Sequence, residues 1–204
     1  MLFTLTRLRH LRPMLLITGL AAGAPCLAEE TTMGELNVTM TANIVDNTCQ
    51  ISLSDNGEVH LPTVSRYWFY KIDGTTPRLQ PNDAASGTRF SVNVESCDGK
   101  TDALQTMTFR FKPQSGSWPA ESKQVFMNET PTESGGAQNV GVVIFSSNDN
   151  RNVVDSNGDP VAMFAAAPDT YLASYDFYAR YQNTSAVISS GKVTSHVLVD
   201  AIYQ

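Results

Sequence analysis

The sequence predicts an all-β fold, built as an antiparallel sandwich or barrel. Short segments rich in Val, Ile, Phe, Tyr and Thr recur along the chain, separated by clusters of Gly, Asn, Asp and Pro. Helical signals are almost absent, and strands at this spacing favour one sheet packed on another in one domain. The expected strands cover residues 48–54, 59–64, 88–96, 107–112, 140–146, 161–164, 171–181 and 192–203.

The first 28 residues have the three parts of a secretory signal. Arg7, Arg9 and Arg12 supply the positive region, residues 14–24 are apolar or small, and residues 26–28 form a small-x-Ala cleavage site. The apolar part is too short to span a bilayer. Lipidation of Cys26 is the alternative, although Pro25 directly before it is a poor match to a lipoprotein signal. We expect cleavage, which takes 28 from 204 residues and leaves 176.

The mature chain is acidic. Loss of the signal lowers the number of Lys and Arg from 14 to 11, against 20 Asp and Glu, so the formal charge moves from -6 to -9. Such a chain is a poor binder of nucleic acid, because the phosphate backbone demands basic residues. Proteins, or the outside medium, are the expected partners.

Two cysteines, Cys49 and Cys97, survive cleavage. An even pair in an exported chain indicates one disulfide bond. Two buried free thiols are the alternative.

Alternating strands are expected near both ends of the mature chain. The terminal strand carries Val193, Val197, Val199, Ala201 and Tyr203 on one face, with Ser195 as a polar break. The strand near the start carries an apolar face of Leu36, Val38, Met40, Ala42 and Ile44. Because chain ends usually fray unless they are tied down, these strands suggest pairing with other chains.

Aromatic residues gather on two segments that are expected to be loops. Tyr67, Trp68 and Phe69 lie within residues 66–71, and Trp118 lies within residues 113–136. Such clusters can form a candidate receptor patch. The alternative is that the first three residues cover an open end of the sandwich.

No constellation for catalysis or metal binding is found in the sequence. His60 and His196 fall on strand positions, and the nucleophile and phosphate-binding motifs of common enzymes are absent. The acidic segment 155–159 fails as a calcium loop, because Gly158 precedes the third ligand position and Ala166 occupies the twelfth. We therefore expect no enzyme and no cofactor, with a periplasmic enzyme on a sandwich fold as a remote alternative.

Taken together, these segments resemble the chaperone–usher pilins of type 1 and P fimbriae. The resemblance rests on the alternating run and cysteine strand of residues 31–51, the second cysteine strand 90–97, the Gly-Val strand 139–144, the aromatic strand 175–181, Gly191 and Tyr203. It implies an incomplete immunoglobulin-like β-sandwich with six core strands, a missing seventh strand and an N-terminal donor-strand extension. The implied plan is a signal peptide over 1–28, the extension over 29–45 and a pilin domain over 46–204.

The same resemblance implies a structural subunit of a bacterial adhesive fimbria, either a minor adaptor or a shaft pilin. Its apolar extension would enter a neighbouring subunit as the donor strand, with Ala42 where the family usually has Gly. Val197, Val199, Ala201 and Tyr203 would line the groove and contact a periplasmic chaperone, and an outer-membrane usher would be the other partner. The chain would pass through the periplasm to an extracellular fimbria. The alternative is a single-domain adhesive pilin that binds a host receptor through its aromatic loops.

Overall fold

The structure is a computed structural model that describes residues 48–79, 87–98, 106–120, 122–168 and 170–204. The chain divides into two units, Met1–Ala42 and Asn43–Gln204, and all described residues belong to the second unit. The predicted signal and the predicted donor extension lie outside the described residues. Within those residues, no helix has the length and apolar character needed to cross a membrane.

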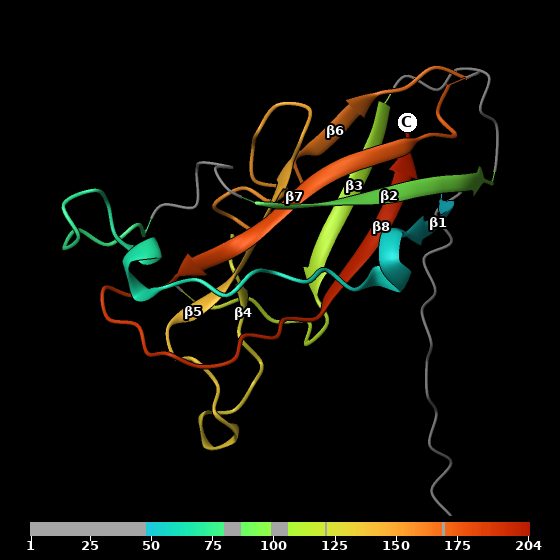
Figure 1. Cartoon of the computed structure of the whole chain (residues 1–204). Helices are drawn as coiled ribbons and strands as arrows, with labels where there is room; N and C mark the ends of the chain where they lie inside the picture. The colour runs from blue at the N-terminus through green and yellow to red at the C-terminus, as the bar shows by residue number, and fades with distance from the viewer. Residues whose placement is uncertain (1–47, 80–86, 99–105, 121, 169) are drawn as a thin grey trace, which may run out of the picture. The chain divides into compact units, whose positions relative to one another are not determined.

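The described strands form two antiparallel sheets (Figure 1). The larger sheet has the order β1-β2-β7-β5-β4, and the smaller sheet has the order β6-β3-β8. Their bounds are β1 Cys49–Leu53, β2 Thr88–Cys97, β3 Thr106–Pro113, β4 Phe126–Met127, β5 Val140–Ser146, β6 Ala162–Ala165, β7 Ser174–Asn183 and β8 Val197–Tyr203. Three short 3-10 helices complete the described elements: η1 Ser54–Gly57, η2 Arg66–Phe69 and η3 Thr132–Ser134.

This architecture confirms the predicted all-β fold, an incomplete immunoglobulin-like β-sandwich. Six of the described strands have five or more residues, and the other two, β4 and β6, are shorter. The core lies between the sheets because alternate side chains of each strand point to opposite faces. Inward positions of β2, β3 and β7 carry large apolar residues, whereas their outward positions are mostly polar.

The centre of the core is aromatic. Phe177 on β7 is fully buried, and its ring centroid lies 5.6 Å from Phe90, 5.4 Å from Phe109 and 5.0 Å from Phe111. Edge-to-face and offset contacts at these separations are favourable for aromatic pairs. This cluster joins β2 and β7 of one sheet to β3 of the other.

The strand predicted over 171–181 is shifted to Ser174–Asn183, and two other predicted strands differ more strongly from the structure. Residues 59–64 form no ladder, although their apolar pattern alternates; within the described residues no strand lies beside them to accept their backbone hydrogen bonds. The terminal strand begins at Val197 instead of Lys192, because the N–H of Lys192 bonds to Gly135 and the carbonyl of Thr194 to Glu129. Residues 192–196 are thus held by loops, and β8 forms only where β3 becomes its neighbour.

Candidate binding groove

A groove of about 600 Å³, with an apolar floor and a polar rim, opens into the core of the sandwich. One wall is formed by residues 57–61 and the other by residues 193–199, which lead into and include the first half of β8. Its floor comes from inward positions of both sheets: Leu53, Phe90, Phe111, Val142, Ile144, Ala179 and Tyr181. Figure 1 shows the course of the two wall segments, one after η1 and the other before β8. The groove is therefore a part of the hydrophobic core that the described chain leaves open.

β8 pairs with β3 along one edge, and its other edge is unpaired along this groove. Gln114 donates to the carbonyl of His196 at 3.0 Å, and Thr106 and Gln204 exchange two bonds of 2.9 Å. Because bonded positions alternate in an antiparallel ladder, the N–H and C=O groups of Val197 and Val199 point to the opposite edge. Among the described residues, Thr48 is the one that pairs with this edge of β8, through an isolated β-bridge to Ile202. From Val197 to Val199 the edge remains available for another strand.

Each wall of the groove is anchored in the core. Val59 and Leu61 pack against the core on one side, and Val197 and Val199 do so on the other. The hydroxyl of Ser195 donates to the carbonyls of Phe126 and Met127, at 3.1 and 2.8 Å. These bonds tie the segment before β8 to β4, which carries Phe126 and Met127.

Two pairs of His and Glu residues lie at the rim. His196 Nδ1 is 2.6 Å from Glu129 Oε2, and His60 Nε2 is 3.4 Å from Glu58 Oε2. Glu58, His60 and His196 belong to the groove lining. All four side chains are more than a third exposed, so they form a solvated border around an apolar interior.

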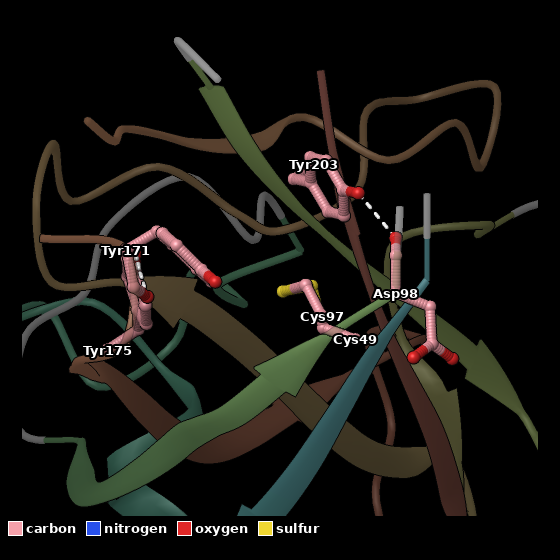
Figure 2. Close-up of a disulfide and its surroundings, with 6 residues drawn as sticks. All are labelled: Cys49, Cys97, Asp98, Tyr171, Tyr175 and Tyr203. Carbon is pink, nitrogen blue, oxygen red and sulfur yellow. Dashed lines mark hydrogen bonds between the residues drawn. A yellow bond between two sulfur atoms is a disulfide. The ribbon is translucent and has the colours of Figure 1, made fainter. Parts of the chain in front are cut away.

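A disulfide bond between Cys49 and Cys97 closes the end of the sandwich beyond the groove (Figure 2). The two cysteines face each other in the β1–β2 ladder. The N–H of Asp98 donates to the carbonyl of Thr48 at 3.0 Å, and the hydroxyl of Tyr203 donates to the carbonyl of Asp98. The bond between the cysteines confirms the predicted pairing, so the alternative of two free thiols is wrong.

Two further tyrosines lie beside the disulfide in Figure 2. The hydroxyl of Tyr175 donates to the carbonyl of Tyr171 at 3.0 Å, and burial raises the pKa of Tyr175. This end of the domain is therefore fixed by one covalent bond and by tyrosine hydroxyls bonded to backbone carbonyls.

The structure separates the four terminal-strand residues that the sequence grouped together. Val197 and Val199 line the groove. Ala201 and Tyr203 are each 2% exposed and lie where Thr48 already covers the edge. Leu36, Val38, Met40, Ala42 and Ile44 lie outside the described residues. Sequence reasoning did not single out the floor residues, although their inward positions on alternating strands were a usable signal.

The four aromatic residues of the candidate receptor patch do not form one exposed surface. Phe69 is buried in a small cluster with Ala137, Val140 and Ile188, and Tyr67 is 77% exposed. The Trp68 ring is only half-buried and faces the guanidinium of Arg78 at 5.7 Å. Trp118 packs on Phe126 at the main core, with 5.0 Å between ring centroids. Of the four, Tyr67 is therefore the one that is largely free to meet a partner.

The acidic segment 155–159 is a turn. The carboxylate of Asp155 accepts N–H groups of Asn157 and Asp159 at 2.8 and 3.0 Å, and these bonds hold its pKa below the usual range. In the part of the chain that the structure describes, no group of three His, Cys, Asp or Glu side chains could hold a metal ion.

The open core and the unpaired edge define an all-β domain suited to binding an extended chain. Residues 37–204 match the family described as Fimbrial protein. The chain is also 32% identical over 187 residues to "Uncharacterized fimbrial-like protein YadK" of Escherichia coli (strain K12), over 88% of this chain and 90% of the relative. The protein therefore belongs to the fimbrial family, whose members are components of an extracellular surface appendage.

The solved structures to which the chain is similar include one that matches at a low level. It is the CupB6 tip adhesin from Pseudomonas aeruginosa, with 17% identity and a TM-score of 0.39. The match covers 60% of this chain, which spans 32% of the adhesin.

Proposed function

We propose that this protein is a structural subunit, a minor adaptor or a shaft pilin, of a bacterial adhesive fimbria. It assembles by donor-strand exchange through the chaperone–usher pathway and has no catalytic role. The observation that carries this proposal is the groove of about 600 Å³, with its apolar floor, beside the unpaired edge of β8.

An empty groove of this kind is costly in two ways. Its apolar lining remains in contact with water, at about 25 cal/mol for each Å² left unburied. The edge of β8 presents free backbone donors and acceptors, which promote uncontrolled pairing with other chains. A single added strand relieves both costs, because its backbone bonds to the edge and its alternate side chains fill the groove.

The proposed final occupant is the segment 36–44 of another subunit. Its alternating apolar residues would point into the groove, and its intervening residues are uncharged Asn and Thr, which would face solvent. Ala42 is the smallest of the five inward residues, and its methyl group limits how closely the donor backbone approaches the floor.

The proposed assembly requires a temporary occupant before the final one. A periplasmic chaperone would first supply a strand along Val197 and Val199, and the donor segment would replace it at an outer-membrane usher. A subunit with both a donor segment and a groove occupies a middle position in a fibre. Its partners are then the chaperone, the usher and the neighbouring pilin subunits.

A peptide-binding experiment tests the groove directly. A synthetic peptide of residues 34–45 is added to the mature chain, and thermal unfolding is followed as the peptide concentration rises. The melting temperature should rise with concentration, because a ligand that binds only the folded state stabilises it. A matched peptide with Val38→Asp should give no shift. Equal shifts with both peptides, or none with either, would contradict the proposal.

The structure gives less support to the alternative of a receptor-binding pilin that uses its aromatic loops. Phe69 and Trp118 are committed to packing within the domain. The exposed residues near Tyr67 are Ile72 and Val187, and we assign them to a contact between subunits.

A further inference from the structure

Residues 66–79 form an ordered hairpin at one end of the described domain (Figure 1). Phe69 anchors it in a buried cluster, Arg78 N–H bonds to the Phe69 carbonyl at 2.9 Å, and Tyr70 OH bonds to the Ala186 carbonyl at 3.2 Å. The carboxylate of Asp73 accepts N–H groups of Thr75 and Thr76 at 2.9 and 2.8 Å and closes the turn. These contacts hold the hairpin against the rest of the domain and close its turn.

The tip of this hairpin is both apolar and basic. Ile72 is fully exposed, Tyr67 is 77% exposed, and Val187 on the adjoining loop is 69% exposed. The hairpin also carries three of the 14 Lys and Arg residues of an acidic chain: Arg66, Lys71 and Arg78. Asp73, its one acidic residue, is ionised, so the hairpin has a net charge of +2 (three basic residues against one acidic residue). An exposed apolar group on a hairpin of net positive charge fits a partner surface that is apolar and acidic.

The opposite end of the same domain has such a surface. Glu95 and Asp98 are exposed around the disulfide, and Leu172 is 55% exposed on the loop before β7. The N–H of Val94 bonds to the carbonyl of Ala173 at 3.0 Å, which holds this loop beside the end of β2. The hairpin contacts the other end of β7, where the side-chain amide of Gln182 donates to the carbonyl of Arg78. The basic and acidic surfaces therefore lie at opposite ends of β7.

Chain length decides which end of the groove a donor subunit occupies. Ile44 and Cys49 are five residues apart, a distance of at most about 18 Å. At the Val199 end, β8 continues to Tyr203 and Thr48 bridges to Ile202, so the acceptor's own strands fill the space. At the other end, Val193 packs into the same small cluster as Phe69, next to the hairpin. The folded domain of the donor subunit consequently lies beyond the Val193 end of the acceptor's groove.

From these observations we propose that the hairpin is an interface for a second copy of this chain. Ile72, Tyr67 and Val187 contact the surface around Leu172 of the next subunit, while Arg66 and Lys71 face its Glu95 and Asp98. This inference rests on the proposed strand exchange, because the donor segment brings the two ends together. The contact would fix the angle between consecutive subunits.

Photo-crosslinking in assembled fibres tests this contact. A benzophenone-bearing amino acid is placed at Ile72 in the full chain, in cells that carry a chaperone and an usher, and crosslinked peptides are mapped by mass spectrometry. Crosslinks should join residue 72 to the 88–98 or 170–175 peptides of another copy. The same probe at Met163, which is 55% exposed on β6, should not reach those peptides.

Charge reversal at the proposed contact is a second test of the interface. Arg66→Glu with Lys71→Glu should lower the crosslink yield roughly twofold to fivefold for each pair lost at low salt, as expected for exposed ion pairs. Adding Glu95→Lys and Asp98→Lys should restore the yield, and Lys71→Arg should leave it unchanged. Normal fibres with crosslinks to another surface or protein, or no restoration, would overturn this inference alone. Failure of the unsubstituted chain to form fibres would overturn the proposed function and the interface with it.

Discussion

The hydroxyl of Tyr203 donates a hydrogen bond to the backbone carbonyl of Asp98, the residue that follows the disulfide-bonded Cys97 (Figure 2). Tyr203 ends β8, the strand that borders the groove, whereas Asp98 follows β2 in the other sheet. The bond therefore ties the groove-forming strand to the covalently closed end of the sandwich. It fixes one end of β8 while the other half of its edge stays open.

Removing this hydroxyl should weaken the domain without changing its packing. Tyr203→Phe removes this part-buried hydrogen bond to the carbonyl of Asp98, so the free energy of unfolding should fall by about 0.5–1.5 kcal/mol. Urea denaturation of the full chain measures the change. Tyr67→Phe, at an exposed position, is the matched control and should shift the midpoint little. Equal effects of the two variants would contradict the role assigned to Tyr203.

Loss of the disulfide should have a larger effect. The bond joins residues separated by 48 positions. Closing a loop of that size contributes about 4 kcal/mol through the entropy of the unfolded chain. Cys49→Ala combined with Cys97→Ala should lower stability by about 2–5 kcal/mol, and reduction of the unsubstituted chain should do the same. If the reduced and oxidised chains unfolded at the same urea concentration, this account of the closed end would be wrong.

Acidification should open the hairpin through Asp73. Its carboxylate accepts bonds from the Thr76 hydroxyl and from the N–H groups of Thr76 and Thr75, which lower the pKa of Asp73 from 3.8 to about 2. Because the folded pKa lies below the unfolded value, the stabilisation is present above about pH 4 and is lost as the pH falls through about 2.

The amide resonances of Thr75 and Thr76 report this change in NMR spectra. They should titrate with a midpoint near pH 2, and Asp73→Asn should abolish the titration. A midpoint at the ordinary value of 3.8 would show that the carboxylate does not hold the turn.

The sequence predicted the sheets well where a run rich in β-branched and aromatic residues is bounded by turn residues. Residues 140–146 were expected as a strand and form β5 with the same bounds. The pattern failed at residues 59–64, because alternation reports which side chains are buried and does not report whether a neighbouring strand is present. Residues 126–127 were missed, because a two-residue strand is too short to show a period.

The groove could be predicted only in part. Val197 and Val199 follow from the alternation of the terminal strand, whereas Phe90 and Tyr181 join them through strand order, which depends on contacts distant in the sequence. The aromatic run was ambiguous for a similar reason. Tyr67 and Phe69 are two residues apart, yet Tyr67 is exposed and Phe69 is buried because of the turn of η2. Composition alone does not reveal that turn.

The central claim is that the extension acts in another molecule, while β8 acts in its own fold. Val38→Asp and Val199→Asp separate these roles, because an unpaired carboxylate costs several kcal/mol wherever it is buried. The measurement is the amount of periplasmic chaperone complex and of surface fibre formed by each variant. Val38→Asp should keep the chaperone complex and lose the fibre, and Val199→Asp should lose both. Fibres formed by Val38→Asp, or loss of its chaperone complex, would contradict the assignment of donor and acceptor strands.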